Sequence, residues 1–121
     1  MEKEYLNDLE MAEEFLKAAK NNLKTSLRTA ANRLYFALER AVIAYLKKKN
    51  VKAPKNHQQL WNLTAENLGE EYYQGLRKAY DLRMQADYGV ISIFTELTTE
   101  SIERNLMITE ILIGKIKKTI G

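Results

Sequence analysis

The residues best suited to chemistry lie near the end of one predicted helix. Arg83 and Asp87 are four residues apart, so they share one helical face, and Tyr88 follows directly. A guanidinium matches a phosphate through its planar fork, whereas an unpaired charge on a buried face is costly. The spacing therefore leaves two interpretations open, a structural ion pair or an anion-binding group that faces a cleft.

A second group of cations lies on the predicted helix before it. Between Lys20 and Lys55 the chain has ten basic residues and one acidic residue, Glu39. Arg33 and Arg40 are seven residues apart and therefore share a face of an otherwise apolar helix. They either extend to water at the edge of the fold or, with Arg83, line a groove that binds RNA or nucleotide phosphates.

Composition excludes several kinds of site. The 121 residues include no cysteine and a single histidine, His57, which excludes thiolate and multi-histidine metal sites. No glycine-rich phosphate loop is present. We predict no metal and no cofactor, and we expect His57 to be a helix cap or a hydrogen-bonded structural group.

The chain also lacks the signals of a membrane or exported protein. No apolar run approaches the roughly 18 residues that a membrane span needs. The first residues, 1–4, are charged, unlike a signal peptide. We therefore predict a cytoplasmic location and no membrane partner.

The pattern of apolar residues indicates the elements that hold these side chains. Apolar residues recur every three or four positions, with few glycines and one proline between them. We predict an all-α, up-and-down bundle of four to five helices in a single domain, 1–121. The predicted helices span residues 2–23, 27–49, 57–65, 70–86 and 99–118, and the apolar run 90–94 is predicted to be a packed connector.

Three motifs resemble those of the HEPN domain, whose name abbreviates higher eukaryotes and prokaryotes nucleotide-binding. They are Thr29-Ala-Ala-Asn-Arg-Leu-Tyr-Phe-Ala37, Lys55-Asn-His57 before a short helix, and Leu82-Arg-Met-Gln-Ala-Asp-Tyr-Gly89. The resemblance is to the small stand-alone prokaryotic members, and it covers most of the chain in the same order and spacing.

The resemblance implies a helical bundle that forms a homodimer and binds nucleotide or RNA. It also implies a minimal nucleotidyltransferase as partner in a toxin–antitoxin-like pair. The residues expected to contact nucleotide or RNA are Arg33, Arg40, His57, Arg83 and Asp87. This binding module is our first hypothesis.

Several branches of the family are metal-independent ribonucleases, in which four to six residues separate the motif arginine from a histidine. Here Tyr88 occupies that position after Arg83, and no histidine follows His57. A tyrosine, with an ordinary pKa of about 10, is a poor general base. The second hypothesis is therefore catalysis of RNA cleavage by Arg83 with Tyr88 or His57. The third hypothesis is a non-catalytic helical scaffold. The resemblance also makes Tyr88 the nearest counterpart of a tyrosine that is modified with AMP in some members paired with a nucleotidyltransferase.

Overall fold

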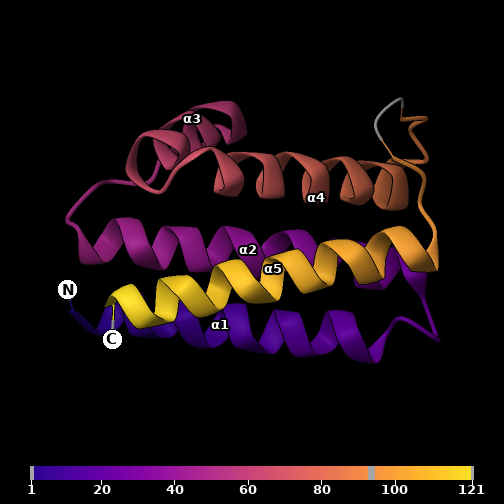
Figure 1. Cartoon of the computed structure of the whole chain (residues 1–121), viewed down its shortest axis with the longest axis horizontal. Helices are drawn as coiled ribbons and strands as arrows, with labels where there is room; N and C mark the ends of the chain where they lie inside the picture. Colours follow the sequence, from indigo (N-terminus) through magenta and orange to yellow (C-terminus); the bar gives the residue numbers. More distant parts are fainter. Residues whose placement is uncertain (1, 93–94, 121) are drawn as a thin grey trace.

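The computed structural model describes residues 2–92 and 95–120 and contains five α-helices (Figure 1). They are α1 (Glu2–Asn21), α2 (Leu27–Lys48), α3 (His57–Asn67), α4 (Glu70–Tyr88) and α5 (Thr99–Ile120). No strand occurs within the described ranges. The all-α prediction is confirmed, and each predicted helix ends within two residues of its observed counterpart.

The central element is α2, which packs against α1, α4 and α5. Its small and branched side chains are buried around most of the helix, including Ala30, Leu34, Leu38 and Val42. A helix that is apolar on so many sides has to contact several neighbours. In Figure 1 the long helices run alternately in opposite directions, and α3 lies beside the first turns of α4 at one end of the bundle.

The remaining helices bury one stripe each and leave the other side polar. In α5 the buried stripe includes Ile102, Leu106, Ile113 and Ile116. Burial of such side chains stabilises a fold by about 1.5–3 kcal/mol each. Among the described helices, none combines the length and hydropathy needed to cross a bilayer.

Local capping fixes where the helices that carry the candidate residues begin and end. Ser26 and Asn56 accept the amide N–H groups of Thr29 and Gln59 at the starts of α2 and α3. Gly89 has φ +66°, a left-handed conformation that glycine adopts easily, and its amide bonds to the Gln85 carbonyl. This cap ends α4 directly after Asp87 and Tyr88.

The connector after α4 differs from its prediction. Val90 is 49% exposed and Ile91 is 92% exposed, so these two residues are not packed as predicted. Polar contacts attach the connector instead, since the Gln85 side chain donates to the Thr95 carbonyl at 2.8 Å and Ser92 donates to Asp81. Ile93 and Phe94, also in the predicted run, lie outside the described residues.

Gly75 sets how closely α4 approaches its neighbours. A Cβ added at this position would lie 3.0 Å from Leu112 Cδ1 and 3.1 Å from Leu38 Cδ2, whereas one added at Gly114 would meet nothing within 4 Å. Both glycines are inside helices, so alanine improves helix propensity by up to about 1 kcal/mol at either position. Only alanine at position 75 has to displace core side chains.

We therefore expect Gly114→Ala to stabilise the protein and Gly75→Ala to be less stable than Gly114→Ala by about 1–3 kcal/mol. Urea denaturation of both variants and the wild type measures this difference. Equal free energies of unfolding for the two variants would show that the core accommodates the methyl group at position 75 without strain.

Candidate functional site

The candidate site is built around the hydroxyl group of Tyr35 on α2. Tyr35 is fully buried, and its hydroxyl donates a hydrogen bond to Glu39 Oε2 at 2.8 Å. Burial first, and then the nearby Glu39 carboxylate, raise the pKa of Tyr35 far above its ordinary value. The phenol therefore keeps its proton and acts as a donor to Glu39.

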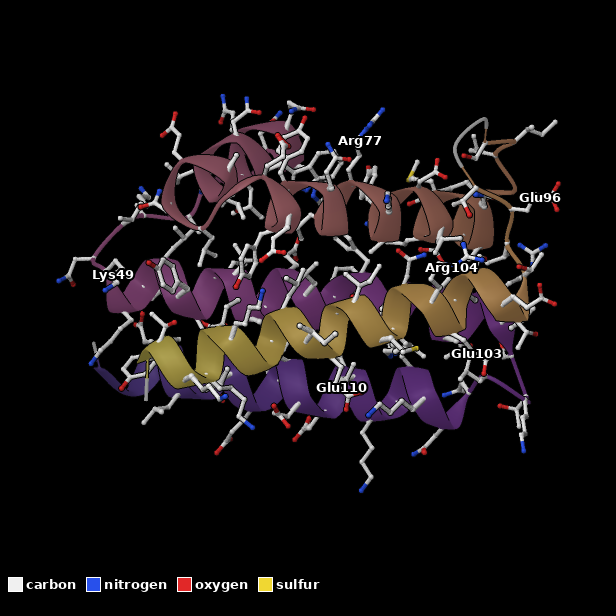
Figure 2. All side chains as sticks on the ribbon, in the orientation of Figure 1. Lys49, Arg77, Glu96, Glu103, Arg104 and Glu110 are labelled. Atoms are coloured by element: carbon white, nitrogen blue, oxygen red, sulfur yellow. The ribbon has the colours of Figure 1, made fainter. Side chains whose placement is uncertain are left out.

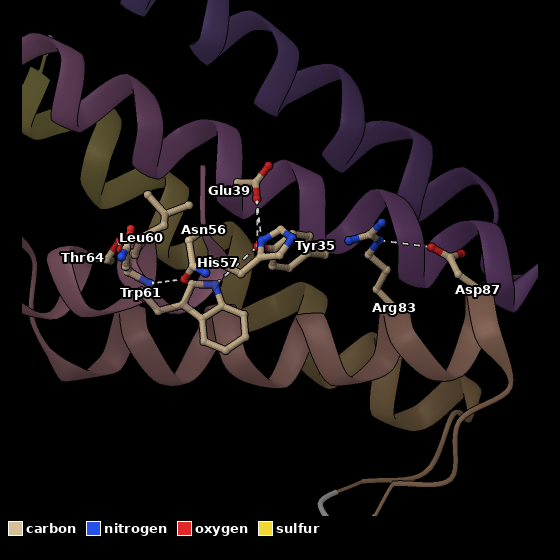
Figure 3. Close-up of polar contacts among 10 residues, drawn as sticks. Tyr35, Glu39, Asn56, His57, Leu60, Trp61, Thr64, Arg83 and Asp87 are labelled. Atoms are coloured by element: carbon tan, nitrogen blue, oxygen red, sulfur yellow. Dashed lines mark hydrogen bonds and ion pairs between the residues drawn. The ribbon is translucent and has the colours of Figure 1, made fainter. Parts of the chain in front are cut away.

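Two side chains from α3 meet the same hydroxyl. Trp61 Nε1 donates to the Tyr35 oxygen at 3.4 Å, and His57 Nδ1 lies 3.0 Å from it (Figure 3). Because the Tyr35 proton goes to Glu39, the pattern is completed when His57 donates to the Tyr35 oxygen from Nδ1–H, and Nε2 of the imidazole takes no part in this contact. The His57 side chain is 40% exposed, so the imidazole links the buried network to the surface.

Arg83 of α4 lies against the rings that surround this network. Its guanidinium carbon is 4.7 Å from the ring centroid of Phe36 and 5.8 Å from the centroids of Tyr35 and Tyr80. A cation at such distances is attracted to the negative face of an aromatic ring. The side chain retains 17% exposure, so the charge is held in place while part of it stays accessible.

A chain of polar contacts joins Arg83 to α2. Arg83 Nε is 3.1 Å from Asp87 Oδ2, and the Asn32 amide donates to the same oxygen at 3.1 Å. Asn32 in turn accepts a hydrogen bond from Arg33 at 2.7 Å. We call Arg33, Asn32, Asp87 and Arg83 the polar chain; it contains two guanidinium groups and one carboxylate, so it carries a net positive charge.

The polar chain adjoins a shallow pocket of about 180 Å³ between α2 and the end of α4. Arg28 lies on its edge and donates to the Ala86 carbonyl at 2.6 Å. A cation suits the carbonyl end of a helix because the helix dipole is negative there. Arg28 thereby holds the last turn of α4, and with it Asp87, against α2.

The structure thus brings together most of the residues predicted from sequence. Arg33, Arg83 and Asp87 belong to the polar chain. His57 lies on the adjacent ring cluster, where its imidazole is 4.8 Å from the ring centroid of Tyr80. Asn56 caps α3, so His57 is not the cap but a hydrogen-bonded structural group beside Tyr35. The predicted binding role of His57 stays a prediction.

Two predicted residues lie elsewhere. Arg40 extends from α2 towards α1, where it donates to the nearly buried Asp8 at 3.1 Å, and Lys47 shares that carboxylate at 2.7 Å. Tyr88 is 65% exposed beyond the polar chain, at the end of α4. The predicted binding role of Arg40 and the predicted catalytic role of Tyr88 stay predictions.

The sequence did not indicate several polar participants, among them Asn32, Glu39, and Tyr35 as a hydrogen-bonding centre. One signal was available, because Glu39 is the single acid among ten bases between Lys20 and Lys55. An isolated acid in such a segment indicates a specific partner. Asn32 gave no comparable signal, since its bond to Asp87 joins residues 55 positions apart.

The site contains no evident metal centre. Within residues 2–92 and 95–120, no three carboxylate, imidazole or thiolate side chains come together as potential ligands. Glu39 and His57 are near each other, with 3.6 Å between Oε2 and Nδ1, but both are bonded to Tyr35. For chemistry, the arrangement offers two guanidinium groups that can bind an anion and the partly exposed imidazole of His57.

The fold and a comparison with protein-family models together identify the kind of protein. The fold is an antiparallel α-helical bundle, and the model of the HEPN domain matches residues 7–119. The chain belongs to the HEPN domain family, which supports a nucleotide- or RNA-related module at the family level. A comparison with curated proteins finds no match.

The hydrogen bonds of Tyr35 should make the stability of the protein depend on pH. Tyr35→Phe removes the donor to Glu39 and the acceptor for Trp61, so we expect a loss of about 1–3 kcal/mol near neutral pH. The raised pKa means that the folded state keeps the Tyr35 proton when the unfolded chain loses it, above pH 10. Above pH 10 the free energy of unfolding of the wild type therefore falls by up to about 1.4 kcal/mol per pH unit because of Tyr35. Tyr35→Phe lacks this contribution to the fall.

Denaturant unfolding of both proteins across pH 8 to 11 checks this expectation, with the range chosen around the ordinary tyrosine pKa of about 10. The stability difference between wild type and variant should narrow as the pH rises. A difference that stays constant across the range would mean that Tyr35 ionises as readily in the folded protein as in the unfolded chain.

Proposed function

We propose that the chain is a nucleotide- or RNA-binding module, the HEPN half of a pair with a minimal nucleotidyltransferase. The observation that carries the proposal is the placement of Arg83. Its guanidinium lies on three aromatic rings, is oriented by Asp87 and stays 17% exposed. A cation that is held in one position in this way pays little ordering entropy when it binds a phosphate.

The surroundings of Arg83 support an anionic ligand. The polar chain adds Arg33, and Asn32 offers amide groups at the same surface. Asp87 is the only carboxylate of the polar chain, so a phosphate can share or replace it as the partner of Arg83. The exposed ring of Tyr88, at the next position, is placed to stack on a base of a single-stranded ligand.

The proposed assembly is a homodimer that pairs with the nucleotidyltransferase. Support comes from the family resemblance and from apolar side chains that remain exposed on α5, Met107 at 66% and Ile111 at 57%. The chain mass is 14.0 kDa, so light scattering should report twice that value for the isolated protein. A mass of one chain at all concentrations would contradict the homodimer.

The proposed binding residues can be tested with a fluorescent single-stranded RNA in EDTA, read by anisotropy. We expect Arg83→Gln to raise the Kd about tenfold or more, because a charge-assisted bond contributes about 1.5–3 kcal/mol. Asp87→Asn should lower the Kd, since it removes the carboxylate that competes with phosphate for Arg83. Lys17→Gln, an exposed cation on α1, is the matched control and should change the Kd little.

The same variants distinguish binding from a purely structural ion pair. If Arg83→Gln and Asp87→Asn both lower the melting temperature and neither changes RNA affinity relative to Lys17→Gln, the polar chain only stabilises the bundle. Circular dichroism of each variant shows that the fold is retained before affinities are compared.

One observation favours a second candidate, metal-independent cleavage of RNA. Arg83 and His57 both lie against the ring of Tyr80, at 5.8 Å and 4.8 Å from its centroid. Nε2 of His57 can accept the proton of a ribose 2′-hydroxyl while that oxygen attacks the adjacent phosphorus. Arg83 would stabilise the charge on the phosphate oxygens, and the 5′-oxygen leaves and takes a proton from water.

Cleavage of labelled RNA in EDTA tests this candidate. We expect products that end in a 2′,3′-cyclic phosphate, and a loss of about 10²–10⁴-fold in rate for His57→Gln, the range typical of a general base. Tyr88→Phe should retain activity if His57 is the base. Loss of cleavage in Tyr88→Phe but not in His57→Gln would assign the base to Tyr88 instead, and absence of cleavage by the wild type would reject the candidate.

A further inference from the structure

A second pocket lies between α4 and α5, on a different side of α4 from the polar chain. Its volume is about 210 Å³, and it is lined by residues of α4, of α5 and of the connector between them. Three of these are basic, Arg77, Lys78 and Arg104, and one is acidic, Asp81. Figure 2 shows Arg104 on the side of α5 that faces α4, and Arg77 extending outward from α4.

The carboxylate of the pocket is already engaged. Asp81 Oδ2 accepts a hydrogen bond from Ser92 and another from the Gln85 amide at 3.2 Å. Lys78 and Arg104 have no ion-pair partner among the described residues, and the side chains of both are exposed. The cations are thus available to a ligand, and the carboxylate contributes less repulsion than an unbonded one.

The pocket also has a polar base and an apolar edge. Asn105 is 6% exposed, and its amide donates one hydrogen to the Ser101 carbonyl, which leaves the second hydrogen for another acceptor. Ile108 is 36% exposed at the rim of the pocket, and the exposed Met107 precedes it on α5. Charged, amide and apolar groups together match a ligand with an anionic head and an apolar or planar body.

The volume limits the size of that ligand. Pockets that enclose drug-sized molecules measure roughly 300–1,000 Å³, so a cavity of about 210 Å³ holds a phosphate with a sugar but not a whole dinucleotide. We propose that the α4–α5 pocket binds the terminal phosphate of a phosphate monoester, with Lys78 and Arg104 as the cationic contacts and Asn105 as the buried donor. A free mononucleotide or the 5′ end of an RNA carries this group.

The experiment is an NMR titration of the full ¹⁵N-labelled chain with AMP, ribose 5-phosphate, and a short RNA with either a 5′-phosphate or a 5′-hydroxyl. We expect AMP to shift the amide signals of Thr95, Arg104 and Asn105, which line the pocket. Lys78→Gln and Arg104→Gln should each raise the Kd for AMP about tenfold. Lys118→Gln, an equal charge change near the other end of α5, should not.

The choice of probes distinguishes a free phosphate monoester from the 5′-phosphate of an RNA. Shifts with AMP and ribose 5-phosphate identify a free ligand, whereas shifts only with the 5′-phosphorylated RNA identify an RNA terminus. The proposal is overturned if no probe shifts these signals, if the 5′-hydroxyl RNA shifts them equally, or if Lys118→Gln weakens binding as much as Arg104→Gln. Arg83→Gln separates the two sites, since it should weaken RNA binding at the polar chain and leave AMP binding at the pocket unchanged.

Discussion

The arrangement of α2 and α3 around the site depends on hydrogen bonds to one buried group, the hydroxyl of Tyr35. Tyr35 is fully buried on the central helix, and a buried hydroxyl without partners would be costly. Glu39 from the same helix and both His57 and Trp61 from α3 meet it. The contacts fix α3 against α2, and the ring of the same tyrosine forms part of the surface on which Arg83 lies.

The polar chain has more positive than negative charge, and this surplus supports the proposed binding of a phosphate. Arg83 of α4 pairs directly with the carboxylate of Asp87, whereas Arg33 of α2 is linked to it only through the amide of Asn32. A fully compensated ion pair would favour rigidity alone, whereas surplus positive charge at a partly exposed position attracts a phosphate. Membership of the HEPN domain family agrees with a nucleotide- or RNA-related use of this surface.

The sequence predicted the helices closely because periodicity, caps and the scarcity of glycine and proline all act within a few residues. It also indicated Arg83 and Asp87 as a pair, since their spacing is local. It could not place Arg40 against Asp8, because 32 residues separate them and either side of α2 could have faced α1. The same limit concealed the Tyr35–His57 contact, which joins residues 22 positions apart and depends on how α3 turns back onto α2.

Gly75 has a consequence for the site as well as for the core. It lies eight residues before Arg83 on α4, a distance of about 12 Å along the helix axis. Its missing side chain lets α4 contact Leu38 and Leu112 closely, and the same helix carries Asp87 to Asn32 of α2. A family member with a larger residue at this position would hold α4 further from α2, and it would need longer side chains than Asn32 and Asp87 to link the two helices.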